Sequence, residues 1–135
     1  MESIDLLPLT NAIRQFEGAL MEYGNEPGRT LLRDGLIQRF EFTYSMCERT
    51  LRRFLEVSSS GSEDIDAMSF PTLIRTASER GLLLHGWDRW EGYRRARNRT
   101  SQTYNETVAL VVVERLPEFS AEANYLLERL KEKVA

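Results

Sequence analysis

Hydrophobic side chains recur along this chain at spacings of three and four residues, a repeat that gathers them on one face of an α-helix. Between residues 6 and 23 this repeat comprises Leu6, Leu9, Ile13, Phe16, Leu20 and Tyr23. Residues 24–28 then contain two glycines, an asparagine and a proline, which is typical of a turn, and Thr30 is a candidate N-cap for the next helix. The pattern predicts a first helix, a reversal of the chain and the start of a second helix.

The longest hydrophobic repeat lies between residues 32 and 54 and predicts a long second helix. Its members are Leu32, Leu36, Phe40, Tyr44, Cys47, Leu51 and Phe54, and among them we expect Phe40, Tyr44 and Cys47 in the core. The segment SSSGSEDID at residues 58–66 has almost no apolar content and predicts a flexible, acidic loop. Its charges, Glu63, Asp64 and Asp66, are interpreted as solvated, because a soft loop would hold acid–base groups poorly.

Two short helices are predicted next, and together they fill one position of a bundle. The first begins near Ser69, has Pro71 in its first turn and ends at Gly81. The second spans residues 87–97, where Trp87 and Trp90 are three positions apart. The inward positions of the first short helix are Leu73, Ile74 and Ala77.

The last hydrophobic repeat follows a T-x-x-E capping box formed by Thr103 and Glu106. It consists of Val108, Val112, Leu116, Phe119, Ala123, Leu126 and Leu130. Pro117 lies inside this series and removes one backbone hydrogen bond, so we expect a kink near Val113 rather than a helix end. The segments predict an all-α protein: an antiparallel up-and-down four-helix bundle with two short helices in one position and a last helix kinked at Pro117.

The composition of the chain excludes several classes of protein. Its 135 residues fall within the size of one domain, and no apolar run approaches the ~20 residues that cross a bilayer, so we expect one soluble domain and no membrane partner. The acidic N-terminus is unlike a secretory signal, and the single cysteine forms no internal disulfide, which fits a cytoplasmic location. The net charge of −3 gives no general attraction for nucleic acid, so any such role must be local.

Motifs that would indicate catalysis or a cofactor are missing from the sequence. There is no glycine-rich phosphate loop, no H-E-x-x-H and no nucleophile elbow. The only histidine, His85, lies at a predicted turn, where a structural or solvent-facing role is favoured over a ligand or base role. We therefore expect no metal and no cofactor.

Positive charge is concentrated between residues 89 and 99, where five arginines accompany one acidic residue. One interpretation is that these arginines lie near a helix C-terminus, whose partial negative charge stabilises them. The other is a phosphate or nucleotide contact at the hinge between two helices. In that case Arg94 and Arg97, one turn apart, would hold phosphates, and Asn98 and Gln102 would contact a sugar or base.

Several segments in order, FEFTY at 40–44, IRTASERGL at 74–82, Trp90 and RNRTSQTY at 97–104, resemble the nucleotidyltransferase substrate-binding proteins. The resemblance covers most of the chain. These small bundle proteins belong to the broader HEPN group, so the resemblance implies a single HEPN-like helical bundle domain over residues 1–135. It also implies a partner, because members are typically paired with a separate minimal nucleotidyltransferase, often as a toxin–antitoxin couple.

Ribonuclease members of that group carry an arginine followed by a polar residue and, after four to six residues, a histidine. Arg97 and Asn98 match this signature, but Gln102 occupies the histidine position. A carboxamide cannot exchange a proton near neutral pH as an imidazole does, although it still forms hydrogen bonds. The resemblance therefore favours a non-catalytic subunit that binds nucleotide or RNA. A ribonuclease toxin with a degenerate motif is the alternative, and a structural interaction bundle is a further one.

The residue Tyr104 follows this motif by two positions. In family members with such a tyrosine the paired nucleotidyltransferase can attach AMP to it, so the resemblance implies that Tyr104 is an AMP acceptor. From the residues alone, a tyrosine in the first turn of a helix is otherwise a packing residue. The aromatic and arginine-rich helix surfaces lead us to expect a homodimer or a hetero-oligomer with the partner.

Overall fold

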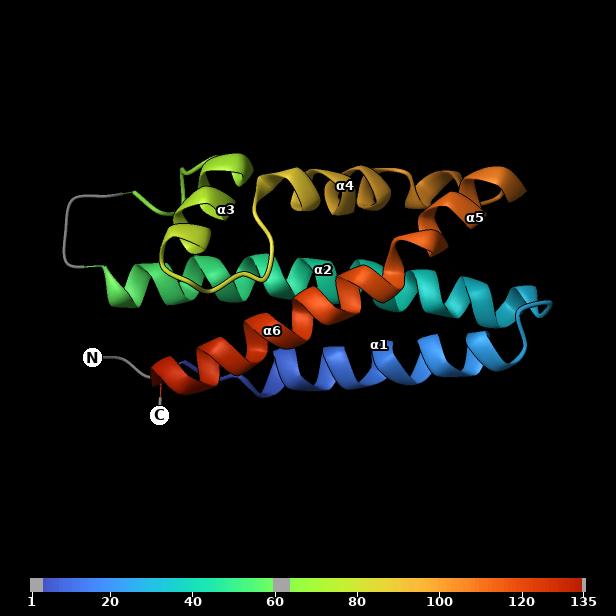
Figure 1. Ribbon diagram of the computed structural model, residues 1–135, viewed down its shortest axis with the longest axis horizontal. Coiled ribbons are helices and arrows are strands. Elements are labelled where there is room, and N and C mark those ends of the chain that lie inside the picture. Colours follow the sequence, from blue (N-terminus) through green and yellow to red (C-terminus); the bar gives the residue numbers. More distant parts are fainter. Residues whose placement is uncertain (1–3, 60–63, 135) are drawn as a thin grey trace.

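The computed structural model describes residues 4–59 and 64–134, and this part of the chain consists of helices and turns without a strand (Figure 1). The elements are α1 (Leu7–Asn25), α2 (Thr30–Ser58), α3 (Phe70–Glu79), α4 (Trp87–Asn98), the 3₁₀ turn η1 (Thr100–Gln102), α5 (Glu106–Glu114) and α6 (Leu116–Val134). The predicted all-α class is confirmed. Glu63 of the predicted acidic loop lies outside the described residues.

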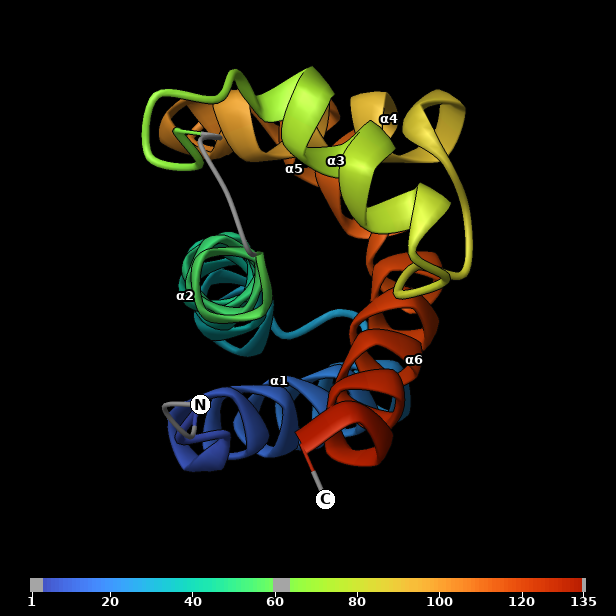
Figure 2. The same cartoon turned by 90° about the vertical axis from the view of Figure 1, so that its left-hand side faces the viewer.

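The helices form a four-position bundle, which Figure 2 shows in a view along its long axis. α1 and α2 lie antiparallel and side by side, and α6 packs beside α1. α3 and α4 follow one another in the position across α2 from α1, as predicted for the two short helices (Figure 2). No helix within residues 4–59 and 64–134 is long and apolar enough to span a membrane.

The core contains a cluster of aromatic rings drawn from α1, α2, α3, α4 and α6. Phe119 of α6 lies at its centre, with ring centroids 5.9 Å from Phe16, 5.1 Å from Phe40 and 5.3 Å from Tyr93. Edge-to-face pairs of this kind contribute about 0.5–1.5 kcal/mol each beyond the burial of their area. Cys47 is fully buried nearby in α2, and burial raises the pKa of its thiol, so it is a core residue as expected.

The observed starts of α3 and α2 can be compared with the helix starts predicted from the sequence. The helix predicted to begin near Ser69 starts at Phe70, and Ser69 is its N-cap, because the Ser69 side chain accepts a hydrogen bond from the backbone N–H of Thr72 at 3.4 Å. The prediction that Thr30 is an N-cap is wrong: Thr30 is the first residue of α2, and the preceding Arg29 makes no side-chain cap. A threonine that follows a turn therefore does not by itself identify the N-cap of the next helix.

The predicted capping box of Thr103 and Glu106 is also wrong. Asn105 caps α5 by accepting a hydrogen bond from the Val108 N–H at 3.2 Å, while the Thr103 hydroxyl donates to the carbonyl of residue 100 at 3.0 Å. Glu106 instead forms an ion pair at 2.7 Å with Arg33, a buried residue of α2. The physical reason is η1, which occupies residues 100–102 and delays the start of α5.

The kink predicted at Pro117 is present as an interruption of the helix at Arg115. α5 ends at Glu114 and α6 begins at Leu116, so the interruption at Arg115 lies two residues after Val113, and it is a helix end where only a bend was expected. Pro117 therefore lies in the first turn of α6, where its missing N–H is not needed by the helix. Figure 1 shows the resulting change of direction between α5 and α6.

A buried carboxylate joins α6 to the loop between α3 and α4. Glu122 is 0% exposed and accepts hydrogen bonds from the backbone N–H groups of Leu84 at 2.7 Å and His85 at 3.2 Å. Its Oε1 also lies 3.1 Å from Nδ1 of His85 and accepts from the Tyr93 hydroxyl at 3.3 Å. The only histidine of the chain thus has a structural partner, in agreement with the structural interpretation of His85.

Replacing Glu122 with alanine should lower the free energy of unfolding by about 2–4 kcal/mol, because the backbone N–H groups of Leu84 and His85 would lose their acceptor, while the Tyr93 hydroxyl keeps Glu118. Urea unfolding followed by circular dichroism measures this change. The exposed Glu128 of α6 provides the control, since Glu128→Ala should change stability by less than about 0.5 kcal/mol. Equal stability of the two variants would show that the Glu122 hydrogen bonds do not hold the loop.

Candidate functional site

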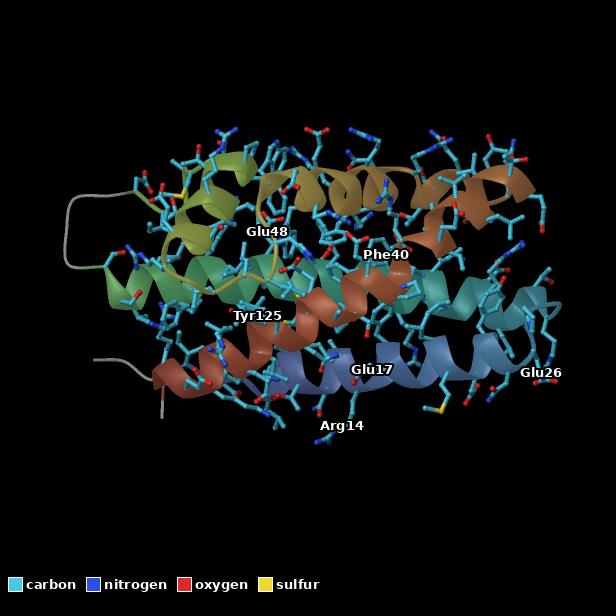
Figure 3. The ribbon with its side chains drawn as sticks, viewed as in Figure 1. Arg14, Glu17, Glu26, Phe40, Glu48 and Tyr125 are labelled. Carbon is cyan, nitrogen blue, oxygen red and sulfur yellow. The ribbon has the colours of Figure 1, made fainter. Side chains whose placement is uncertain are left out.

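A polar cleft of about 500 Å³ lies between α2, the start of α3 and the C-terminal half of α4. We call it the arginine cleft. Glu48 points from α2 into the space below α3 and α4, as Figure 3 shows. The lining residues are Tyr44, Ser45, Glu48 and Arg52 from α2, Met68, Ser69 and Phe70 at the start of α3, and Arg94, Arg97 and Asn98 from α4.

Arg94 presents its guanidinium at the edge of this cleft. The guanidinium carbon lies 5.3 Å from the centre of the Phe70 ring, a cation–π arrangement. It makes no hydrogen bond or ion pair with another residue of the described chain. Stacking on Phe70 therefore orients the group while leaving its N–H donors available to a ligand.

Arg97 is held from the α2 side by Glu41 and by a buried threonine. Its Nη1 lies 3.5 Å from Oε2 of Glu41 and donates to Oγ1 of Thr100 at 3.3 Å. The Thr100 hydroxyl lies 3.0 Å from the same Glu41 oxygen and 2.9 Å from the Arg97 carbonyl. The Arg97 side chain is still 35% exposed, so these contacts orient it without removing it from solvent.

Arg97 also lines a second cleft on α2, together with Phe42, Ser45 and Arg49. It therefore separates two neighbouring hollows on the same face of the molecule. Ser45 is common to both. A ligand seated in the arginine cleft would meet Arg97 at one edge of that cleft.

Tyr44 forms the floor of the arginine cleft. Its ring packs in the core, 6.1 Å from Phe40 and 6.3 Å from Trp90 between centroids, as the hydrophobic repeat predicts. Burial raises the pKa of the Tyr44 phenol, and the Glu48 carboxylate raises it further, against the opposing effect of Arg94 and Arg97. The hydroxyl consequently stays protonated at neutral pH and acts as a neutral donor.

The other two predicted site residues, Gln102 and Tyr104, do not line the arginine cleft. Gln102 is the exposed last residue of η1, and Tyr104 is 89% exposed in the following turn. The structure thus brings Arg94, Arg97 and Asn98 together and leaves Gln102 and Tyr104 outside.

Two other arginines of residues 89–99 form ion pairs at the surface. Arg89 pairs with Glu118 of α6, and Arg95 pairs with Glu91 one turn earlier in α4. Arg95 and Arg97 lie in the last turn of α4, where the helix dipole favours positive charge. The helix-dipole interpretation thus fits Arg95 and Arg97, while phosphate contact by Arg94 and Arg97 stays a prediction.

The chemistry available at the cleft is anion binding rather than proton transfer by an imidazole. His85 immediately precedes α4 and Arg97 lies near its end, so roughly 15 Å of helix separates them. His85 is also hydrogen-bonded to Glu122 on the α6 side. Among residues 4–59 and 64–134, no three His, Cys, Asp or Glu side chains are grouped to hold a metal ion.

Sequence reasoning missed Tyr44, Ser45, Ser69 and Arg52 as cleft residues. Tyr44 belongs to a hydrophobic repeat, which predicts its ring but says nothing about its hydroxyl. Ser69 entered the sequence analysis only as the approximate start of a helix. Neither residue carries a local signal for ligand contact, since both reach the cleft through the packing of α3 and α4 on α2.

Comparisons with known proteins agree with this architecture. The family model described as "Nucleotidyltransferase substrate binding protein like" matches residues 4–132. A curated relative from Haemophilus influenzae, named "Probable ribonuclease HepT", is 34% identical over 99 residues, which are 73% of this chain and 67% of that protein.

A solved structure from Haemophilus influenzae, described as the fold of a substrate-binding domain of a nucleotidyltransferase, superimposes with a TM-score of 0.86. It is 29% identical and the match covers 94% of this chain and 99% of that one. Because the family model spans nearly the whole bundle, including α4 with its arginines, the chain belongs to the nucleotidyltransferase substrate-binding protein family.

Proposed function

We propose that this chain is the non-catalytic substrate- or nucleotide-binding subunit of a two-component system in which a separate minimal nucleotidyltransferase performs the chemistry. The observation that carries the proposal is the arginine cleft, where Arg94, Arg97 and Asn98 converge without an imidazole. Arginine binds phosphate through two parallel hydrogen bonds, so such a cleft suits a phosphate-bearing ligand. The proposal includes a cytoplasmic setting and a toxin–antitoxin pairing.

In this proposal the ligand lies along the C-terminal half of α4. Arg94 and Arg97 hold its phosphates, and the amide of Asn98 contacts its sugar or base. Gln102 and Tyr104 contact only a ligand, or a partner, that extends beyond the end of α4. The ion pair of Arg97 with Glu41 keeps the guanidinium beside the opening before a ligand arrives.

A ribonuclease is the second candidate, and the name of the Haemophilus influenzae relative favours it. Metal-independent cleavage of RNA needs a group that exchanges a proton near neutral pH. Gln102 cannot supply it, and His85 is engaged with Glu122 at the other end of α4. These two facts make binding the better-supported function.

Association with a partner chain is part of the proposal. Phe42 is 58% exposed on α2, in the hollow beside Arg97, and an exposed aromatic ring of this kind is typical of an interface. Both a homodimer and a hetero-oligomer with the nucleotidyltransferase are consistent with it. A purely structural bundle would need no arginine cleft beside this ring.

Arg97→Ala should weaken the binding of ATP or a short RNA by about tenfold to a hundredfold, because a charge-assisted contact to phosphate is lost. Its melting temperature should barely change, since the half-exposed pair with Glu41 contributes little. Arg95→Ala is the matched control, because Arg95 lies in the same helix and pairs with Glu91 outside the cleft. Isothermal titration measures the affinities. Equal weakening in both variants would contradict a specific role for Arg97.

The purified chain should leave RNA intact, because Gln102 cannot transfer the proton that strand cleavage requires. Incubation with labelled RNA followed by gel electrophoresis provides the measurement, and Gln102→His is the informative variant. Cleavage by the wild type that disappears in Arg97→Ala would place the ribonuclease function first.

We expect Tyr104 to accept AMP when the chain is incubated with a nucleotidyltransferase partner and ATP, because its side chain is 89% exposed and a partner's active site can reach it. The phenol oxygen attacks the α-phosphorus of ATP, pyrophosphate leaves and the phenol proton passes to solvent. Intact-mass spectrometry should record one added adenylyl group in the wild type and in Tyr125→Phe, and none in Tyr104→Phe. An adenylyl group on Tyr104→Phe would rule out this tyrosine as the acceptor.

A further inference from the structure

The hydroxyl of Tyr44 is a polar group in a largely buried side chain. Tyr44 is 6% exposed, and its side chain lines the arginine cleft. No residue of the described chain forms a hydrogen bond with its hydroxyl. The hydroxyl oxygen is not one of the fully buried unpartnered atoms of the described chain, so it reaches the cleft that Tyr44 lines. Water or an entering ligand can therefore accept its hydrogen bond there.

Two positive groups from other elements lie at the same cleft as this hydroxyl, together with the Glu48 carboxylate, whose effect on the Tyr44 pKa exceeds that of Arg94. Arg94 of α4 has no protein acceptor in the described part of the chain, and it acts electrostatically on Tyr44. The N-terminus of α3 opens on the same cleft at Ser69 and adds the partial positive charge of a helix start. The Tyr44 hydroxyl and the Arg94 guanidinium thus offer donors to one volume, and the start of α3 adds positive potential there, which favours an anionic group with several acceptor oxygens.

The one carboxylate among the described residues that line the cleft is paired with a cation, although it still acts on Tyr44. Glu48 accepts hydrogen bonds from Arg52, at 3.3 Å from Nε and 3.1 Å from Nη2. Arg52 is also committed to the carbonyls of Ile65 and Met68 at 3.0 and 2.8 Å, so it fixes the start of α3 rather than serving a ligand. The other positive charges at the cleft are those of Arg94 and Arg97, and Arg97 also forms an ion pair with Glu41.

We propose that the arginine cleft seats one phosphate group, with the Tyr44 hydroxyl and the Arg94 guanidinium as its principal donors. The inference rests on the phosphate-bearing ligand of the proposed function and deepens it by assigning the seat and a new ligand-binding residue. A tetrahedral phosphate has enough acceptor oxygens to receive donors from α2 and α4 together, beside the positive potential of the start of α3. Tyr44 suits this role because its hydroxyl stays neutral and is not repelled by an anion.

The test compares phosphate ligands on variants that remove single donors. ATP and inorganic pyrophosphate are titrated by calorimetry into the wild type, Tyr44→Phe, Arg94→Gln and the control Tyr125→Phe. Tyr125 is a half-buried tyrosine of α6 outside the cleft, labelled in Figure 3. We expect Tyr44→Phe to weaken both ligands by about tenfold, Arg94→Gln to weaken them by about tenfold to a hundredfold, and Tyr125→Phe to have no effect.

Stability without ligand gives an independent readout. Because the Tyr44 hydroxyl has no hydrogen bond to the described residues, Tyr44→Phe should keep or raise the melting temperature of the free protein. A lower melting temperature would reveal a structural partner for the hydroxyl and overturn the inference. Wild-type affinity in Tyr44→Phe would also overturn it and leave the proposed function standing. A wild type that binds neither ATP nor pyrophosphate would instead overturn the proposed nucleotide binding itself.

Discussion

The packing of Trp90 against α2 and α6 is the contact on which the candidate site depends. Its indole lies 6.3 Å from the Tyr44 ring and 6.0 Å from the Phe119 ring between centroids, and it is almost fully buried. Arg94 and Arg97 follow Trp90 by four and seven positions, which places all three on one face of α4. Burial of the indole against α2 therefore also turns the two arginines toward α2. The same ring cluster fixes Tyr44, so the floor and the wall of the cleft come from one hydrophobic contact.

The opposite end of α4 is fixed by a polar contact instead. Glu122 collects the free N–H groups of the loop before α4 and the hydroxyl of Tyr93, and a carboxylate is tolerated in the core because it has these donors. This arrangement engages the single imidazole of the chain far from the arginines. The bundle thus separates the arginine cleft at one end of α4 from a hydrogen-bonded end that serves stability, which is consistent with the proposed binding subunit.

Much of this architecture follows from the spacing of hydrophobic residues, and the exceptions share a physical cause. The starts of α3 and α4 and the burial of Phe40, Tyr44 and Cys47 depend on local periodicity, so they could be predicted. The start of α5 could not, because Thr103 and Asn105 are both competent caps and the 3₁₀ turn decides between them.

Local sequence patterns could not predict the role of Glu122 or the arginine cleft, because both depend on residues that are distant in the sequence. The donors of Glu122 come from a loop 37 and 38 positions earlier in the chain. Arginine spacing predicted Arg94, Arg97 and Asn98 as neighbours, while Tyr44 and Ser69 join them only through tertiary packing.

The central claim, that ligand phosphate sits between α2, α3 and α4, is tested most directly by backbone amide chemical shifts during an ATP titration. The account predicts the largest shifts around Tyr44, Ser69 and Arg94, whereas shifts concentrated at Gln102 and Tyr104, with the cleft unperturbed, would contradict it.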